Sequence, residues 1–188
     1  MENKKRKFLA LCGISGSGKN SVESILDGYY DNVNGVFFKK LNQVTTRNIR
    51  NTDEFNSGIY SFITIDIYNL IKENLIGKTV IDNKYYYGTL DTSTTDGCIN
   101  TIIVNAKGLS NLKNDLNNKY GEDNYDLFVL QIANNTPVER RNRDAEFIRG
   151  EYNDLKGLSN ATLINNPSKW LTVSDVINCL KKEGFLDT

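Results

Sequence analysis

The chain has 188 residues, of which 39% are hydrophobic, and its formal net charge at neutral pH is zero. This size fits one domain, no run approaches the roughly 20 apolar residues of a membrane-spanning helix, and no net charge draws the chain toward nucleic acid or lipid. The absence of histidine excludes histidine-based triads and the common zinc sites. The cysteines, Cys12, Cys98 and Cys179, have no paired spacing, which favours a reducing, cytoplasmic setting.

Strand-like and helix-like segments alternate along the chain. Short apolar or alternating runs predict strands at 7–12, within 36–44, and at 60–64, 85–87, 98–104, 127–132 and 162–164. Apolar residues at helical spacing predict helices around 22–29, 67–71, 109–116 and 173–180. Gly88 is expected to end the 85–87 strand, and Thr172 and Asp175 have the spacing of a helix-capping pair. The alternation predicts an α/β fold in which helices flank both faces of a central parallel sheet.

The strongest motif is GISGSGK, residues 13–19, which lies between the first expected strand and the first expected helix. It satisfies the P-loop pattern, in which loop N–H groups and a helix N-terminus bind phosphates. Lys19 would reach the β- and γ-phosphates of ATP. The residues expected to bind the triphosphate are Gly13, Ser15, Gly16, Ser17, Gly18, Lys19, Asn20 and Ser21. A glycine-rich turn without a ligand is the alternative, and the strand–loop–helix context argues against it.

One position departs from the P-loop motif. The residue after the lysine is normally Ser or Thr, whose hydroxyl binds Mg²⁺, but here it is Asn20, followed by Ser21. Because an amide oxygen also ligates a hard cation, Asn20 is the expected magnesium ligand. A shifted Ser21, or weak metal binding, remains the alternative.

A second cluster of anion-binding residues follows in the stretch QVTTRNIRNTDEFNSGIYSFIT, residues 43–64. Arg47 and Arg50 are close in sequence, and Tyr60 follows in the same stretch. Two guanidinium groups with a phenol suit the dianion of a phosphate monoester. A solvated loop with incidental arginines is the alternative. After a P-loop, this cluster indicates a phosphoryl acceptor that itself carries a phosphate.

These residues resemble the guanylate kinase family, whose pattern contains Thr-Thr-Arg, a second arginine, a Gly-Glu turn, Asp-Tyr-x-Phe and then Tyr-Tyr-Gly-Thr. Arg47, Arg50 and Tyr60 match the first part, the tyrosine after a short insertion, and residues 86–89 match the second. The resemblance covers nearly the whole chain. It implies that the acceptor is bound by Gln43, Arg47, Arg50, Tyr60, Tyr87, Thr89 and Asn105.

The resemblance continues in the charged segment ERRNRDAEFIR, residues 139–149. In the family this segment is a mobile lid whose arginines neutralise charge on the transferring phosphoryl group. The resemblance gives this role to Arg143 and Arg149, assigns Arg140 to the ATP site, and places Asn165 near the adenine of the donor. A charged surface helix is the alternative.

The implied architecture is one guanylate kinase-like domain, 1–188, with the P-loop three-layer fold. Its core would comprise 1–43 and 92–188, with an inserted NMP-binding lobe at about 44–91 and a short lid at about 138–157.

Three departures from the family pattern concern base recognition and the metal. The glutamate that selects guanine in the family falls, by counting back from Tyr87 without gaps, on Lys78, which cannot accept from the N–H groups of guanine. Asp82 is a nearby carboxylate that could substitute. A family serine becomes Gln43, and the family's Asp-x-Asp becomes the sequence 103–105, Ile-Val-Asn. The phosphate-binding residues are therefore kept better than the base-reading ones.

The sequence thus predicts an ATP- and Mg²⁺-dependent guanylate kinase, which transfers the γ-phosphoryl group in line to GMP or dGMP. The residues expected to act in catalysis are Lys19, Arg47, Arg143 and Arg149. The alternatives are a kinase for a different or modified (deoxy)nucleoside monophosphate and a non-catalytic guanylate kinase-like binding module. A cytoplasmic monomer or homodimer, without nucleic-acid or membrane partners, is expected.

Overall fold

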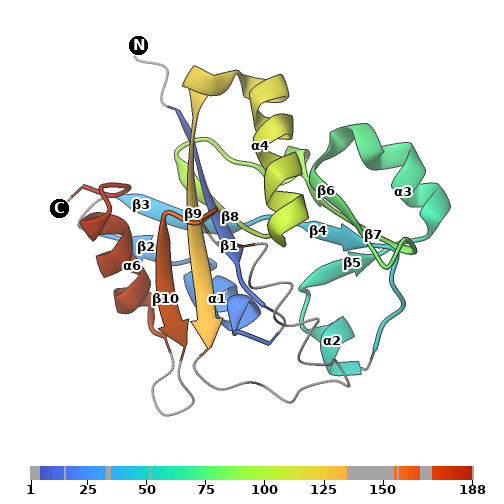
Figure 1. Ribbon diagram of the computed structural model, residues 1–188, viewed down its shortest axis with the longest axis horizontal. Coiled ribbons are helices and arrows are strands. Elements are labelled where there is room, and N and C mark those ends of the chain that lie inside the picture. The colour runs from blue at the N-terminus through green and yellow to red at the C-terminus, as the bar shows by residue number, and fades with distance from the viewer. Residues whose placement is uncertain are drawn as a thin grey trace.

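The main sheet has six strands in the order β10-β9-β1-β8-β3-β2 (Figure 1). The computed structural model describes residues 5–14, 16–32, 35–50, 52–134, 155, 157–165 and 171–187. The strands are β1 Arg6–Cys12, β2 Tyr30–Asp31, β3 Val36–Lys40, β8 Cys98–Ile103, β9 Tyr125–Asn134 and β10 Ala161–Asn165. All neighbouring pairs are parallel except β2 with β3. The expected central parallel sheet is confirmed.

Helices cover both faces of this sheet. Alternate residues of the central strand point to opposite sides, so each side packs against different helices. The helices are α1 Lys19–Leu26, α4 Ala106–Tyr120 and α6 Val173–Lys182, with short 3₁₀ helices η2 Asp91–Ser93 and η3 Glu122–Asn124. Leu9 and Leu11 of β1 pack in one core cluster with residues of α1 and α6. Phe8 and Ala10 pack in a second cluster with residues of α4. This is the three-layer arrangement that the alternating elements predict.

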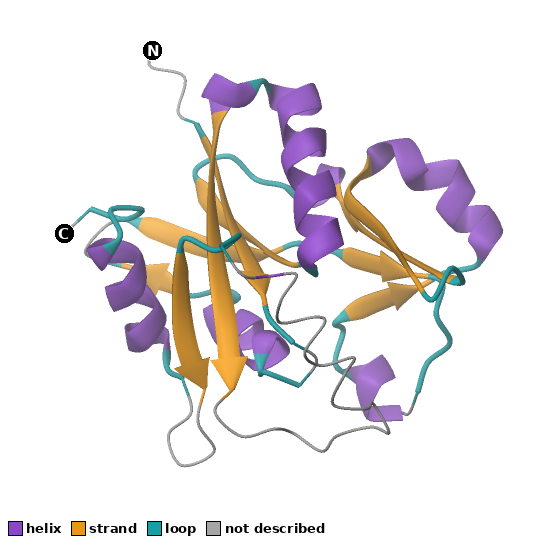
Figure 2. Cartoon of the chain, viewed as in Figure 1, coloured by secondary structure: helices purple, strands orange, loops and turns teal. Residues whose placement is uncertain are grey.

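A second sheet, in the order β5-β4-β7-β6, lies beside the main one (Figure 2). Its elements are β4 Gln43–Thr45, α2 Thr52–Asn56, β5 Tyr60–Phe62, α3 Ile65–Ile71, η1 Lys72–Asn74, β6 Leu75–Ile81 and β7 Tyr85–Leu90. One face of this sheet packs on α3 through a small core of Val44, Tyr68 and Leu75. The other face is turned toward the main sheet, where the Gln43 amide donates to the carbonyl oxygen of Ile103 at 3.3 Å.

The elements differ from the sequence predictions at several places, and three of these concern strands near the second sheet. The one strand expected within 36–44 is instead two strands, β3 and β4, which belong to different sheets. β7 does not end at Gly88 but continues to Leu90. Gly88 suits this strand because an added Cβ would lie 2.9 Å from the Leu75 side chain on β6. Strand β6 itself was not predicted, because Gly77 and Lys78 interrupt its apolar pattern.

Two predicted apolar stripes are only partly buried. In α1, Val22 and Leu26 are buried, whereas Ile25 is 39% exposed. In α3, Leu70 is 82% exposed and Tyr68 provides the buried contact. Helical spacing therefore identified these helices but not the faces that they bury. Among the described residues, no helix is long and apolar enough to cross a membrane.

The predicted capping pair of α6 is confirmed as a capping box. Thr172 Oγ1 accepts from the Asp175 N–H at 3.3 Å, and Asp175 Oδ2 accepts from the Thr172 N–H at 2.8 Å. Thr172→Ala is expected to cost about 1 kcal/mol, because it leaves an N–H of the first turn without its cap. Urea unfolding measures this loss. Ser174→Ala, an exposed change in the same turn, is the control, and equal midpoints for the two variants would contradict the assignment.

Candidate functional site: the P-loop and the polar face of the second sheet

The P-loop joins β1 to α1 at the carboxyl end of the parallel sheet, where ligands bind in open α/β folds (Figure 1). Its glycines have positive φ angles, 150° at Gly13, 83° at Gly16 and 97° at Gly18. A Cβ at Gly13 would collide with the Ile132 carbonyl oxygen on β9, and a Cβ at Gly18 would collide with the Asn165 amide on β10. The loop therefore requires glycine both for its conformation and for its close packing on the sheet.

The P-loop carries two side-chain donors, the Lys19 ammonium and the Ser17 hydroxyl. Lys19 Nζ donates to the carbonyl oxygens of Gly13 and Ile14, each at 2.8 Å. The Ser17 hydroxyl is fully buried and has no hydrogen-bond partner among the described residues. Because a buried polar group without a partner is costly, a ligand that accepts from Ser17 would remove this cost. A phosphate chain fits these donors.

Asn165 braces the P-loop from β10. Its Nδ2 donates to the Ser17 carbonyl oxygen at 3.1 Å, and its Oδ1 accepts from the Leu171 N–H at 3.4 Å. Both ends of the amide are therefore engaged in holding the loop, and contact with the adenine of a donor stays a prediction. Asn20 and Ser21 lie in the first turn of α1, and both are exposed.

Arg47 follows β4 and is bound by Glu54 of α2 through a two-pronged ion pair. Arg47 Nη2 lies 2.5 Å from Glu54 Oε1, and Nη1 lies 3.1 Å from Oε2. The same carboxylate accepts from the Arg50 backbone N–H at 2.9 Å. The third donor of the guanidinium, Arg47 Nε, is buried and has no partner among the described residues. Glu54 thus occupies the fork that the sequence assigns to a phosphate, and the Arg47 Nε–H is left for a ligand.

The pKa values follow from this pairing. Burial alone would lower the pKa of Arg47, but the hydrogen bond and charge of Glu54, together with the Tyr87 phenol, raise it above its usual value. Burial would likewise raise the pKa of Glu54, yet the hydrogen bonds from Arg47 and the Arg50 N–H lower it below the usual value. Both groups are therefore charged across the neutral range, and the guanidinium is held in place for an anion.

Tyr60 and Tyr87 lie beside Arg47 on the inward face of the second sheet. Their ring centroids are 6.0 Å apart, and the Arg47 guanidinium lies 5.6 Å from the centre of the Phe62 ring. Burial raises the pKa of Tyr60 to about 12, with smaller contributions from Tyr87 and Glu23. Tyr60 is therefore a neutral phenol at neutral pH, which can donate to a phosphate oxygen. The structure thus brings Arg47, Tyr60 and Tyr87 together, and their binding of an acceptor stays a prediction.

Gln43 and Thr89 extend the same face, since they pair directly across β4 and β7. Both are nearly fully buried. Asn105 is placed differently, because its Oδ1 accepts from the Gly108 N–H at 2.7 Å and caps α4. Any role of Asn105 toward an acceptor would fall to its amide nitrogen.

Neither Lys78 nor Asp82 lies on the inward face of the second sheet. The pairing of β6 with β7 is irregular between Ile76 and Thr79, so Lys78 has no direct partner on β7. Lys78 turns to α4, where its Nζ lies 3.5 Å from Asp115 Oδ1. Asp82 lies in the tight turn between β6 and β7, with a φ angle of 55°, and not on the polar face.

Glu23 is an unexpected member of the site. It lies on the same side of α1 as Lys19, one turn later, and is 1% exposed with no hydrogen-bond partner for either oxygen among the described residues. Its nearest cation is Lys40, whose Nζ lies 3.9 Å from Oε2 and donates to the Gly58 carbonyl oxygen at 3.1 Å. Burial raises the pKa of Glu23 to about 8, although Lys40 opposes this rise. Lys40 thus connects the P-loop helix to the segment that carries Tyr60.

The buried side-chain atoms without partners, among the described residues, all belong to four residues: Ser17, Glu23, Arg47 and Thr79. One lies in the P-loop, one on α1, one after β4 and one on β6. Sequence analysis identified Ser17 and Arg47 and missed the others. Glu54 could have been found from the Gly-Glu turn of the family pattern, whereas Glu23 and Thr79 carry no local signal. Ser15, Arg140, Arg143 and Arg149 lie outside the described residues.

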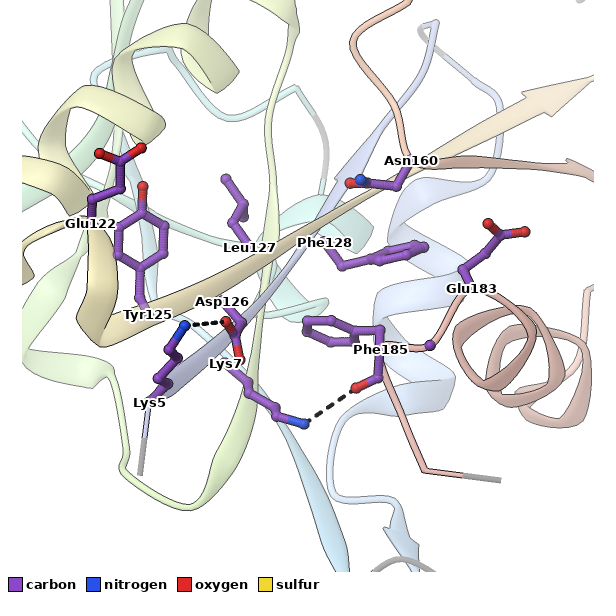
Figure 3. Close-up of a pocket in the computed structure, with 11 residues that line it drawn as sticks. Lys5, Lys7, Glu122, Tyr125, Asp126, Leu127, Phe128, Asn160, Glu183 and Phe185 are labelled. Carbon is purple, nitrogen blue, oxygen red and sulfur yellow. Dashed lines mark hydrogen bonds and ion pairs between the residues drawn. The ribbon is translucent and has the colours of Figure 1, made fainter. Parts of the chain in front are cut away.

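A separate hollow of about 580 Å³ lies at the amino ends of β1 and β9 (Figure 3). Its lysines are engaged, because Lys5 pairs with Asp126 at 3.4 Å and Lys7 Nζ donates to the Phe185 carbonyl oxygen at 3.2 Å. This hollow is at the opposite end of the sheet from the P-loop and shares no residue with it.

Comparison with known proteins supports the fold assignment. No family model matches the chain, and no curated protein matches it. The crystal structure of guanylate kinase from Anaplasma phagocytophilum is similar, with a TM-score of 0.56 over 86% of this chain and 78% of that chain, at 15% sequence identity. This chain has a guanylate kinase-like fold. At this identity the likeness concerns the fold alone.

Proposed function

We propose that the protein transfers the γ-phosphoryl group of ATP to a nucleoside monophosphate. The observation that carries this proposal is the placement of the unpartnered buried polar atoms at two anion-binding clusters. Ser17 lies in the P-loop cluster and Arg47 in the cluster on the second sheet. Between them, Lys40 bridges Glu23 of α1 and Gly58 of the second sheet's segment. The guanylate kinase-like fold supports the same function.

The donor would be held by the P-loop. Lys19 would exchange its loop carbonyl partners for phosphate oxygens, and Ser17 would gain the acceptor that it lacks. Mg²⁺ would be held by Asn20 or Ser21 together with the phosphates, because amide and hydroxyl oxygens suit a hard cation and both residues are exposed in the first turn of α1. When bound, Mg²⁺ supplies positive charge that neutralises the phosphates.

The acceptor phosphate would be held by Arg47, Arg50, Tyr60 and Tyr87. Because this phosphate is already an anion, no general base is required, and catalysis consists of positioning and charge stabilisation. We assign Arg143 and Arg149 to the lid that completes the site, and Arg140 to the ATP side, on the resemblance alone. The first acceptors to test are GMP and dGMP.

A second candidate is a kinase for another (deoxy)nucleoside monophosphate. The second sheet favours it, because Lys78 pairs with Asp115 of α4 and the paired residues of the inward face, 43, 45, 60, 62, 79, 87 and 89, contain no carboxylate. A panel of monophosphates with ATP separates the two candidates. A preference for guanine nucleotides supports the first candidate, and efficient transfer to a monophosphate with another base supports the second.

Arg47→Met is expected to raise the KM for the monophosphate about ten- to a hundredfold, because it removes charge-assisted hydrogen bonds to the acceptor. ATP binding should be unchanged, since Arg47 belongs to the second sheet's cluster. Steady-state ADP release and ATP titration measure the two effects. Lys84→Met, an exposed change in the turn between β6 and β7, is the control. An unchanged KM for every monophosphate would contradict the acceptor assignment.

A further inference from the structure

Thr79 is a buried hydroxyl with no partner on the face that carries the proposed acceptor site. It is 9% exposed, and its Oγ1 makes no hydrogen bond within the described residues. A hydroxyl enclosed without a partner destabilises the fold. A ligand that forms a hydrogen bond with Thr79 Oγ1 would remove this cost.

Strand register places this hydroxyl in line with the phosphate-binding residues. Thr79 pairs directly with Tyr87, Tyr87 pairs with Thr45, and Thr45 pairs with Phe62. Directly paired residues lie on one face of a sheet with their Cβ atoms about 5 Å apart. The row therefore runs from the Phe62 ring, beside the Arg47 guanidinium, to Thr79 at the far strand.

The irregular pairing of β6 produces this placement. Gly77, with a φ angle of 63°, donates its N–H to Asp115 of α4 at 2.9 Å, and Asn111 donates to the Lys78 carbonyl oxygen at 2.5 Å. These bonds hold residues 77 and 78 on α4. The next residue, Thr79, is the one that β6 presents to Tyr87.

We propose that Thr79, together with Gln43, contacts the base of the acceptor nucleotide through uncharged hydrogen bonds. This inference rests on the proposed function and deepens it. The Gln43 amide nitrogen donates to the Ile103 carbonyl oxygen, which leaves the amide oxygen to accept from a base amino group. The paired rows of this face, residues 43, 45, 60, 62, 79, 87 and 89, contain no carboxylate. A neutral edge of hydroxyl and amide groups matches more than one base, so the acceptor class is nucleoside monophosphates with weak base selectivity.

Thr79→Val is the matched test, because it removes the hydroxyl and keeps the shape. Binding of GMP, AMP, CMP and dTMP is measured by calorimetry, and kcat/KM is measured with ATP. In the wild type we expect the affinities to lie within about a hundredfold of one another, far below the 10⁴-fold discrimination of sites built on obligatory hydrogen bonds. Thr79→Val should lower affinity for the best acceptor about three- to tenfold, leave ATP binding unchanged, and raise the unfolding midpoint by about 3 °C. Thr79→Ser should retain wild-type affinity.

Ser61→Val on the opposite face of the same sheet is the control and should change neither affinity. Wild-type affinities retained in Thr79→Val for every monophosphate, or a preference for GMP above a thousandfold, would overturn the inference and leave the proposed kinase function standing. If Glu23→Gln instead of Thr79→Val abolished discrimination among the bases, Glu23 would be the base-reading residue and the inference would fall. Failure of all monophosphates to bind the wild type would overturn the proposed function and this inference together.

Discussion

Lys19→Met is expected to lower kcat/KM for phosphoryl transfer by about a hundred- to a thousandfold, the effect of removing one preorganised donor from a developing charge. In the structure, the Lys19 ammonium is held within the P-loop by two carbonyl oxygens at 2.8 Å. Methionine fills similar space but supplies no charge and no donor. The rate of ADP formation in the presence of a monophosphate measures the loss.

Folding must be separated from chemistry in this experiment, because Lys19 also holds the P-loop. Circular dichroism and the unfolding midpoint should show a folded variant, since Gly13 and Gly18 still pack against β9 and β10. Lys113→Met on the exposed side of α4 is the matched control. Full activity in a folded Lys19→Met protein would contradict the role of the P-loop as the donor site.

Glu23→Leu is expected to stabilise the protein increasingly as pH rises. Burial raises the pKa of Glu23 from 4.5 to about 8, so the folded state keeps a proton that the unfolded state releases above pH 4.5. Unfolding therefore becomes easier as pH increases through this window, and the contribution of the protonated side chain is lost by about pH 8. The shift corresponds to at most about 5 kcal/mol. Leucine has no proton to lose, so the variant should not show this decline.

Urea unfolding of both proteins at pH 5 and pH 8 measures the difference. Cys12 and Tyr60 do not titrate between pH 5 and pH 8, because burial raises the pKa of these groups to about 11 and about 12. Arg47 and Glu54 stay charged throughout this range, and in the variant Lys40 loses Glu23 but keeps the Gly58 carbonyl oxygen at both pH values. Parallel loss of stability in the wild type and Glu23→Leu would show that Glu23 does not titrate near pH 8 in the folded protein.

Local sequence signals predicted the features that local physics determines. The P-loop glycines are needed at Gly13 and Gly18 for positive φ angles and close packing, and the motif alone revealed them. Likewise, the Thr172–Asp175 capping box depends on residues of a single turn. The buried parallel strands were found because their apolar runs reflect burial on both faces.

Features that depend on pairing between distant segments could not be predicted. The sequence predicted one strand within 36–44, yet the chain crosses from one sheet to another after Lys40. The irregularity at Gly77 and Lys78 is fixed by Asp115 and Asn111 of α4, which no count along β6 reveals. The contact of Lys78 with Asp115 of α4 is likewise a pairing between distant segments.

The residues of the candidate site also fall into those that a local motif identified and those that it did not. Motifs identified Arg47, Tyr60 and Tyr87, and the structure brings them together. The partner of Arg47, Glu54, and the enclosed groups Glu23 and Thr79 are defined by burial and by neighbours from other elements. Such groups become visible only when hydrogen-bond partners are counted in three dimensions.

The most direct test of the account is to incubate the wild-type protein with ATP, Mg²⁺ and each nucleoside monophosphate and to identify the products by chromatography. The two anion-binding clusters predict equal amounts of ADP and a nucleoside diphosphate, with little ADP when no monophosphate is present. ADP release without a nucleoside diphosphate, or no consumption of ATP with any monophosphate, would contradict the proposal that these clusters form one phosphoryl-transfer site.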